Sequence, residues 1–391
     1  MRVHTSSRKS DQSGVSFIVP AFNAEKTLSR CLDAIRAQTF SNSEPYAVEI
    51  IVVDDGSSDD TSAVAASHGA IVVQQENSGA ARARNQGLLK ATYEAVAFID
   101  ADVVISENWA GQCLLTLETP WIDCVQTPVV PDGPAGFMTT FRRDFIGYKT
   151  QGHYCYLVNA KESAPVLNSS AFMSRRSYLK DCAYAFDENL RRGEDLDFSL
   201  QLFFGGCHFA VASAASARVY DERSAFRYLM RSFQDGRWTF EVLRAWNIDP
   251  KPLRRKRKLR LPPSPISALF IRLNLAATRL GLFVSSKGLF RINSRKSEKR
   301  PPGPDYRNPF LLRVEKSSLK RETRLILLAD ELIFASARDL SRLTLNKQQS
   351  ETVKNLIATT MKTGHHERND LRRAESVLAL LMTHGFMSEE A

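Results

Sequence analysis

The sequence predicts an α/β protein with a Rossmann-like, doubly wound sheet, followed by a C-terminal helical region. Three observations lead to this fold class. Short β-branched runs alternate with helical segments between residues 15 and 130. The chain of 391 residues, 43% of them hydrophobic and 25% charged, is long enough to bury a large core. Polar motifs follow the expected strands, at the edge where such sheets bind ligands.

Four buried strands are expected in the first hundred residues: VSFIVP (15–20), VEIIVVDD (48–55), AIVVQ (70–74) and AVAFID (95–100). Three helices are expected between them, at 25–37, 61–67 and 80–91. Gly69 is placed to end the second helix. Strands and helices that alternate at this spacing predict a parallel sheet.

The rest of the chain has a different character. Residues 131–250 show weaker periodicity, and residues 251–316 read as a basic, proline-broken linker with an amphipathic helix from Ile266 to about Leu289. Three helices are expected in 317–385, the second of them after a cap at Ser350. The first is centred on Leu325, Leu328, Leu332 and Ala335. The expected division is a disordered tail (1–13), an α/β domain (14–250), the linker (251–316) and a helical region (317–391).

The net charge of +10 lies entirely in the C-terminal part. Residues 1–250 carry a net charge of −6 and residues 251–391 a net charge of +16. A nucleic-acid partner is therefore not expected for the catalytic region. Residues 251–300 hold 15 basic residues and one acidic residue. A basic cluster beside an amphipathic helix favours an anionic membrane surface, ahead of a solvated linker or a nucleic-acid patch.

The characteristic motifs of several functional classes do not occur in the sequence. The six cysteines form no CxxC pair and suggest reduced, buried thiols. The seven histidines show no zinc-hydrolase spacing, and neither GxSxG nor GxxxxGK[ST] occurs. The first fourteen residues lack an apolar signal region, and no uncharged apolar window reaches about 18 residues. We expect a cytoplasmic protein, peripheral on the inner face of the plasma membrane.

Pairs of carboxylates follow two of the expected strands. Asp54 and Asp55 precede Gly56, which suits either a tight turn with a capping Asp or acceptors for the donors of a base or ribose. Asp100 and Asp102 flank one residue after an apolar strand, so their side chains point the same way. Such a pair suits Mg²⁺ or Mn²⁺ bridging phosphates, although a polar turn explains it equally well.

Three further motifs have both structural and functional explanations. Arg84, on the third helix, can neutralise phosphate or pair with a neighbouring Asp. Glu194 and Asp195 begin an apolar helix, where they act as favourable N-terminal charges or supply a general base. Trp238, in QDGRW, is either a core residue or a platform for a sugar face.

Taken together, these motifs resemble the family 2 glycosyltransferases, which have the nucleotide-sugar-binding GT-A fold. The resemblance covers roughly residues 14–245 and rests on VSFIVPAFNAEKTLSRCLDAIRAQTF, VEIIVVDDGSSDDT, ENSGAARARNQGL, AFIDADVVI and RGEDLDFSLQLFFGG. It implies an inverting, metal-dependent transferase of hexosyl or related groups. The implied partners are a nucleotide-diphosphate sugar, with a UDP-sugar favoured, and a glycan or lipid-linked acceptor.

The resemblance also implies roles for individual residues. Asp195 matches the family's general base, with Glu194 before it, and Asp102 matches the direct ligand of Mn²⁺ or Mg²⁺. Asp55 matches the carboxylate that reads the base. The residues matching the nucleotide-sugar site are Pro20, Ala21, Phe22, Asn23, Glu25, Asp54, Asp55, Arg84, Asp100 and Ala101.

Two positions depart from the family pattern. Asp221 stands where a metal-binding His is common, and Phe22 replaces the usual Tyr. QDGRW resembles the QxxRW motif of processive synthases, which carry transmembrane helices. We expect a non-processive relative in cell-surface polysaccharide synthesis, with an acceptor site that contains Trp238.

Two alternatives stay open. The first is a non-catalytic nucleotide-binding subunit of a polysaccharide synthesis complex, for which Asp221 is the sequence argument. The second is nucleotidyl transfer, which would need a glycine-rich and basic loop after the first strand. PAFNAEKTL does not supply such a loop.

Overall fold

The protein is described here by a computed structural model. Its described residues are 13–40, 46–119, 122–132, 136–150, 169–181, 185–246 without 206, 213 and 221–223, 265–287, and short pieces at 157–158, 163–164 and between 313 and 389. The tail expected at 1–13 lies outside this part of the chain, except for Ser13. The domain boundaries at 250 and 316 stay predictions.

The N-terminal elements confirm the predicted alternation of strands and helices. They are β1 (Gly14–Ala21), α1 (Glu25–Arg36), β2 (Ala47–Asp54), α2 (Thr61–Ser67), β3 (Ile71–Gln74), α3 (Ala80–Lys90) and β4 (Ala95–Ile99). β1 pairs in parallel with β2 and β4, and β2 pairs in parallel with β3. The doubly wound sheet expected from the sequence is therefore present.

Both faces of this sheet are buried, which explains why its strands read as continuous apolar runs. On β1, Phe17 packs in the same core cluster as Leu28 of α1, whereas Ile18 points to the other face and packs in the cluster that contains Leu88 of α3. Alternate residues of one strand thus support helices on opposite sides of the sheet.

The middle of the chain adds two further layers of structure. Its elements are β5 (Val103–Ile105), α4 (Trp109–Leu117), β6 (Cys124–Gln126), β7 (Val129–Asp132), α5 (Phe137–Thr150), β8 (Leu157–Val158), β9 (Ser163–Ala164), β10 (Ala171–Arg175), α6 (Arg176–Asp181), α7 (Glu194–Gly205), β11 (Phe209–Val211), β12 (Ala217–Tyr220), α8 (Ala225–Ala245) and α9 (Pro265–Ser286). β10 joins the main sheet antiparallel to β4 and β6. A second sheet has the order β5-β12-β7. It places the end of β12 beside the turn that follows β4, because Val219 pairs with Val103.

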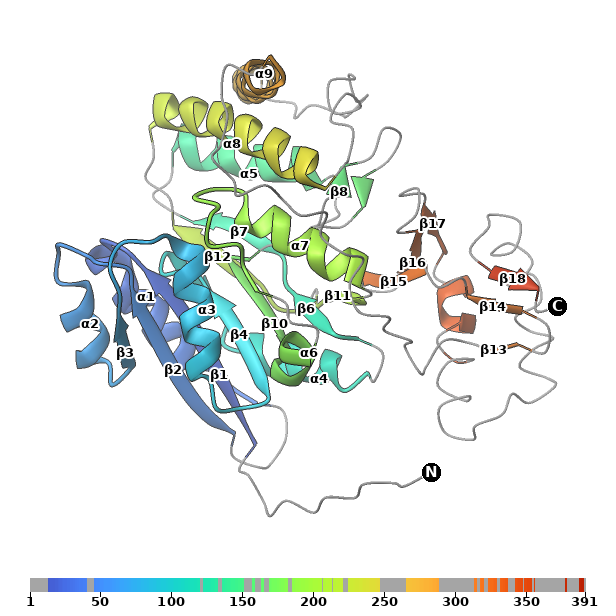
Figure 1. Cartoon of the computed structure of the whole chain (residues 1–391), viewed down its shortest axis with the longest axis horizontal. Helices are drawn as coiled ribbons and strands as arrows, with labels where there is room; N and C mark the ends of the chain where they lie inside the picture. The colour runs from blue at the N-terminus through green and yellow to red at the C-terminus, as the bar shows by residue number, and fades with distance from the viewer. Residues whose placement is uncertain are drawn as a thin grey trace.

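Helices form a layer beyond the sheets, and α9 is its outermost member (Figure 1). α9 matches the helix expected at 266–289. In Figure 1, α9 is seen end-on above α8, and α5 lies beneath α8. Within the described residues, α9 is also the helix whose length and mean hydropathy of 1.4 would allow it to cross a membrane.

The helix expected around Leu325 and Leu332 is wrong. The segment forms two strands, β15 (Thr323–Leu328) and β16 (Glu331–Ser336), which pair antiparallel. β15 adds to the main sheet in parallel with β11. Apolar spacings of three and four residues fit a helix, but a short apolar run also fits a strand when a sheet edge offers backbone partners.

The remaining strands are β13 (Arg313–Val314), β14 (Ser317–Leu319), β17 (Arg342–Thr344) and β18 (Met387–Glu389). Residues 348–353 are helical, as expected, but Ser350 is inside the helix. Asn346 is the cap, because its side chain accepts from Gln349 N–H and its N–H donates to the Gln349 side chain, both near 3.0 Å. The third expected helix lies largely outside the described residues.

Candidate active site

The loops after β1 and β2 are bound to each other. Asn23, which has a left-handed φ of 49°, donates its N–H to Ser57 Oγ at 2.9 Å, and its side-chain oxygen accepts from Ser58 N–H at 2.9 Å. Ala21 accepts from Asp55 N–H at 2.8 Å. Phe22 between them stays 51% exposed. The two loops thus form one hydrogen-bonded rim that presents an aromatic ring to solvent.

Asp54 and Asp55 are both buried and both support loops. Asp54 Oδ1 accepts from Ser57 N–H at 2.9 Å, which closes the turn after β2. Asp55 accepts from the Gln75 side chain and Ser78 N–H at 2.7 Å each, and from Gly79 N–H at 2.8 Å. Asp55 therefore fixes the start of α3 to the end of β2.

Arg84 connects two acidic motifs that are distant in the sequence. Its buried guanidinium donates to Asp100 Oδ1 at 2.7 Å and to Glu194 Oε1 at 3.1 Å. It also lies over the ring of Phe186, 5.2 Å from the ring centre. Burial favours the neutral form, but the carboxylates of Asp100 and Glu194 outweigh it and hold the pKa of Arg84 above its usual value. The buried Nε atom has no hydrogen-bond partner in the described part of the chain.

The turn after β4 holds Asp100, Ala101 and Asp102. Asp100 N–H donates to Ser170 O at 3.0 Å, and Tyr220 N–H donates to Asp102 O at 2.8 Å. The chain therefore leaves β12 directly beside Asp102. Asp221 follows Tyr220 but lies outside the described residues.

A buried thiol lies beneath the same turn. Cys31 donates to Asp100 O at 3.6 Å, and burial together with the charges of Asp102 and Asp100 raises the pKa of Cys31 well above its usual value. Cys31, Cys113, Cys124 and Cys207 are buried and unpaired, as expected for reduced thiols.

Asp195 lies in the first turn of α7, next to Glu194. Its Oδ1 accepts from Leu196 N–H at 2.7 Å. The residue keeps contact with solvent, yet the surrounding protein, and after it the charge of Glu194, raise the pKa of Asp195 to about 6. Because Asp195 is exposed, the neighbouring charge of Glu194 is the cause of the raised pKa that does not depend on burial.

The loop before α7 is held by α8. Gly193 has a left-handed φ of 78°, and a Cβ there would lie 3.2 Å from Val242 and 3.7 Å from Trp238 Cβ. Arg192 donates to Asp235 at 2.9 Å. QDGRW therefore lies on the helix that packs beside the loop leading to Glu194 and Asp195, with Trp238 partly buried.

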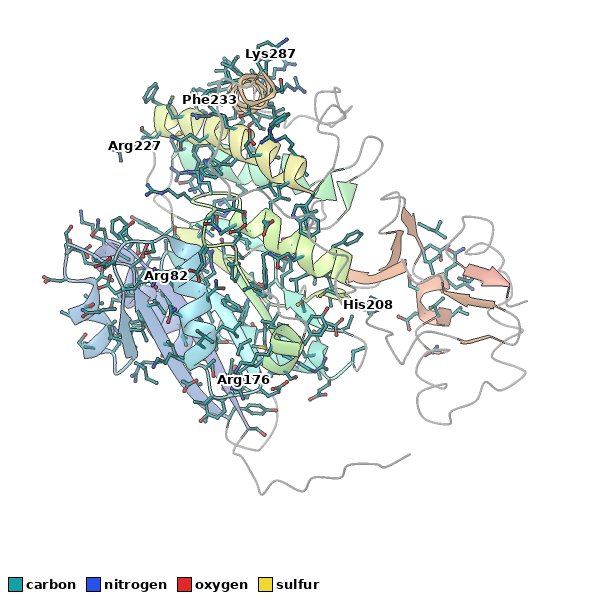
Figure 2. The ribbon with its side chains drawn as sticks, viewed as in Figure 1. Arg82, Arg176, His208, Arg227, Phe233 and Lys287 are labelled. Atoms are coloured by element: carbon teal, nitrogen blue, oxygen red, sulfur yellow. The ribbon has the colours of Figure 1, made fainter. Side chains whose placement is uncertain are left out.

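A hollow of about 270 Å³ opens at the edge of β3 and α3. It is lined by Val73, Gln74, Gln75, Glu76, Arg82 and Gln86. Arg82, labelled in Figure 2, is exposed on α3, in contrast to buried Arg84. The hollow contains none of the predicted catalytic or metal-binding acids, but Gln75 connects it to Asp55. We therefore place the candidate site by the ion pairs and not by the hollow.

Several of the predicted residues are connected through α3. Arg84 of this helix brings Asp100 together with Glu194, whose neighbour in α7 is Asp195. Asp55 contacts the start of the same helix. Glu25 supports the rim, since its N–H donates to Asp59 at 3.2 Å and its carboxylate accepts from Asp60 N–H. Among the described residues, no three His, Cys, Asp or Glu side chains lie close enough to hold a metal ion.

Three supporting residues were not singled out from the sequence. Gln75 and Phe186 contact Asp55 and Arg84, and Tyr220 aligns β12 with Asp102. No local pattern marks them, because each acts through a partner more than ten residues away along the chain.

Residues 16–182 match the sequence profile described as "Glycosyl transferase family 2". This part of the chain belongs to glycosyl transferase family 2. The resemblance stated from the motifs is therefore confirmed.

Curated relatives include an uncharacterized glycosyltransferase, EpsJ, from Bacillus subtilis (26% identity over 199 residues, 48% of this chain and 56% of EpsJ). The pre-mycofactocin glycosyltransferase of Mycobacterium tuberculosis is also 26% identical, over 39% of this chain and 32% of that protein. The chain thus spans about half, or less, of the relatives it matches.

Solved structures with a similar arrangement include Staphylococcus aureus TarS 1–349 (22% identity, TM-score 0.44, 70% of this chain and 73% of that chain). Another is the mannosyltransferase PcManGT from Pyrobaculum calidifontis, in complex with GDP-Man and Mn²⁺ (18% identity, TM-score 0.47, 71% and 76%). With TM-scores below 0.5, these likenesses add nothing to the family 2 assignment or to the strand order above.

Proposed function

We propose that this chain is an inverting glycosyltransferase. It moves a sugar from a nucleotide-diphosphate sugar, with a UDP-sugar favoured, to a glycan or lipid-linked acceptor. The observation that carries this proposal is the Arg84 bridge, because one buried guanidinium holds Asp100, from the turn after β4, and Glu194, from the start of α7, at a single place. Membership of family 2 supports the reaction class.

The donor would lie against the rim formed by the β1 and β2 loops. Phe22 offers an exposed ring to the base, and Asp55 offers the remaining acceptor capacity of a carboxylate that already accepts three hydrogen bonds out of about four. The unpartnered Nε of Arg84 is a donor suited to the diphosphate.

A divalent cation fits the donor set, because carboxylate oxygens are the ligands that Mg²⁺ and Mn²⁺ prefer. Asp102 and Asp221 would hold it, since Tyr220, the residue before Asp221 in the sequence, donates its N–H to Asp102 O. When bound, the cation supplies neutralisation of the charge that develops on the leaving diphosphate.

Asp195 is proposed as the general base. With Oδ1 engaged by Leu196 N–H, Oδ2 takes the proton of the acceptor hydroxyl. The hydroxyl oxygen forms a bond to the anomeric carbon while the bond from that carbon to the diphosphate oxygen breaks, and the bonding electrons leave with the nucleotide. A pKa of about 6 leaves Asp195 mostly deprotonated at neutral pH and still basic enough to accept the proton.

Asp195→Asn tests this assignment. We expect transfer to fall by about 10²–10⁴-fold, because the amide cannot accept the proton, while donor binding is retained. The measurement is transfer from radiolabelled nucleotide-sugars with Mn²⁺ or Mg²⁺, with the retained binding followed by thermal shift. Asp33→Asn, at a carboxylate that is 67% exposed on α1, is the matched control. Near wild-type transfer by Asp195→Asn would refute the role of Asp195.

The donor, the cation and the competing function can be separated in one screen. Thermal stability is measured with UDP-, GDP- and other nucleotide-sugars, each with Mn²⁺, Mg²⁺ or EDTA, because a ligand of the native state raises the melting temperature. Metal-dependent stabilisation followed by neither donor hydrolysis nor transfer would favour the non-catalytic nucleotide-binding subunit. We propose cell-surface polysaccharide synthesis, at the inner face of the membrane, as the setting of the reaction.

A further inference from the structure

α9 has its polarity reversed relative to a helix on the surface of a water-soluble domain. Its buried side is made mostly of small or polar residues at spacings of three and four: Ser267, Ile271, Asn274, Gly281, Leu282 and Ser285. Its outer side is made of large apolar residues that are 43–59% exposed: Ile266, Leu269, Leu273, Leu280 and Phe283. A water-facing helix would bury the leucines and expose the serines.

The small residues allow α9 to approach α8 very closely. A Cβ at Gly236 of α8 would lie 2.0 Å from Thr278 O, and a Cβ at Gly281 of α9 would lie 2.0 Å from Phe233 O. Figure 2 shows Phe233 on α8 beneath α9, with Lys287 at the outer edge of the molecule. Backbones that meet over glycine characterise helices packed in lipid, where apolar side chains gain nothing by turning inward.

Hydrogen bonds between the two helices support the same interpretation. Ser232 donates to Asn274 Oδ1 at 2.8 Å in a buried position, and Asn274 in turn donates to Phe270 O at 2.8 Å. Ser285 donates to Arg237 O at 3.4 Å. The polar side chains of α9 are thus used against α8, and its apolar side chains are left for another partner.

The charges around α9 indicate which partner that is. Arg272 and Arg279 lie seven residues apart along one flank, and Lys287 is exposed after the last turn. In the sequence, residues 251–264 add seven basic residues and no acidic one, and residues 288–300 add five basic residues and one acidic residue, Glu298. An apolar stripe bordered by basic groups complements the headgroups and acyl boundary of an anionic bilayer.

The contacts of α8 decide how α9 would lie in that bilayer. Asp235 of α8 pairs with Arg192 at 2.9 Å, in the loop that leads to Asp195, and Trp246 after α8 donates to Asp197 at 2.9 Å. A spanning α9 would have to separate from α8 or draw these charged groups into hydrocarbon, which is costly. An in-plane α9 keeps every one of these contacts.

We propose that α9 docks the protein on an anionic lipid bilayer, lying in the interface with Leu269, Leu273 and Leu280 inserted. Because α8 connects α9 to the loop of Asp195, docking brings the base close to acceptors that reside in the membrane. This deepens the proposed function, on which the lipid-linked acceptor rests, whereas docking itself does not depend on catalysis.

The test is flotation of the full chain with vesicles of phosphatidylcholine, alone or with an equal part of phosphatidylglycerol. The variant Leu273→Glu with Leu280→Glu removes two apolar contacts and adds two negative charges. The control, Leu89→Glu with Leu115→Glu, makes the same change at exposed leucines of α3 and α4. We expect the wild type and the control to float with anionic vesicles, and the α9 variant to lose at least about tenfold in bound fraction.

Three kinds of result would overturn the proposal. One is equal flotation of the α9 variant and the control, or no flotation of the wild type at low salt. Another is a wild-type dimer that the α9 variant converts to a monomer without any vesicle binding, which would make this face a self-association surface. The third is retention of the wild type in membranes after alkaline carbonate extraction, which would indicate a spanning helix.

Catalysis is measured separately. Metal-dependent donor hydrolysis without vesicles is expected to be the same in the wild type and the α9 variant. Leu273 and Leu280 are on the exposed side of α9, whereas α8 is the helix that contacts the loop of the proposed base. Flotation without any hydrolysis or transfer would refute the proposed function and leave docking intact. Hydrolysis without flotation would do the opposite.

Discussion

α1 and α9 are two surface helices that follow opposite rules. α1 buries Leu28, Cys31, Leu32 and Ile35 against the sheet and turns its charged residues outward. α9 buries mostly glycine, serine and asparagine, together with Ile271 and Leu282, and turns three leucines outward. The difference teaches that the outer surface of the family 2 region (residues 16–182) suits water, whereas the outer surface of the α8–α9 layer suits a less polar surrounding.

The same contrast applies to the polar groups. Around the main sheet, buried charges meet at the ends of strands and pair with each other, as Arg84 does with Asp100 and Glu194. In the α8–α9 layer, uncharged polar groups pair between helices, as Ser232 does with Asn274. The first arrangement concentrates charge at the ends of strands. The second joins two helices through a hydrogen bond between uncharged side chains.

The largest expected effect is on the charged arrangement. Arg84→Met would leave two partly buried carboxylates without their cation, so we expect a loss of about 3–5 kcal/mol in the free energy of unfolding, toward the lower end because Asp100 keeps some solvent contact. Urea denaturation measures it. Arg82→Met on the same helix, where the arginine is exposed, is expected to change stability by less than about 0.5 kcal/mol. Equal effects at both positions would show that the bridge contributes nothing specific.

Leucine truncations compare the two helices directly. Leu28→Ala in α1 removes a fully buried side chain, so we expect a loss of about 2–5 kcal/mol. Leu280→Ala in α9 removes a side chain that is 55% exposed, so we expect a change within about 0.5 kcal/mol. Urea denaturation without lipid is the measurement. A large loss from Leu280→Ala would mean that the apolar side of α9 is already covered by protein.

A glycine substitution tests the close approach of α8 and α9. Gly281→Ala places a Cβ 2.0 Å from Phe233 O, and backbone cannot move aside cheaply, so we expect a loss of about 1–3 kcal/mol. Gly136→Ala, where a Cβ would meet nothing within 4 Å, is the control, and its change should stay within about 0.5 kcal/mol. Protease sensitivity of the α8–α9 layer, compared with that of β1–β4, shows whether the loss is local. If Gly281→Ala is neutral, the two helices do not meet as described.

The sequence could predict the family 2 region in detail because local signals agree there. β-branched runs, Gly69 and the polar strand ends each indicate the same alternation, and the structure confirms it. The antiparallel strand β10 could not be predicted, because its place between β4 and β6 depends on pairings across more than forty residues. The segment with Leu325 and Leu332 was predicted wrongly for a related reason, since the edge of β11 decides its state.

The candidate site was predictable residue by residue but not in its connections. Arg84, Asp100 and Glu194 were each singled out from a motif, but no local pattern shows that one guanidinium joins them. Likewise, the spacing on α9 indicated an amphipathic helix, but not which side faces α8. Contacts between distant segments carry that information, and a single sequence does not display them.

The smallest expected effect is on the pH dependence of turnover. Because the pKa of Asp195 is raised to about 6, the proposed base is protonated below that pH, and kcat should fall on an acid limb with an apparent pKa near 6. Glu194→Gln removes a negative charge that raises the pKa of Asp195, so the limb should move to lower pH. Steady-state rates measured across the acid limb, at saturating donor, give the comparison.

The sign of this shift separates the two roles open to Glu194. If Glu194 acts only by its charge on Asp195, Glu194→Gln keeps turnover at neutral pH and moves the acid limb. If Glu194 is itself the base, Glu194→Gln abolishes turnover at every pH, and Asp195→Asn leaves it largely intact. Its ion pair with Arg84 at 3.1 Å favours the first outcome, because that contact already engages one oxygen of the Glu194 carboxylate in holding the guanidinium.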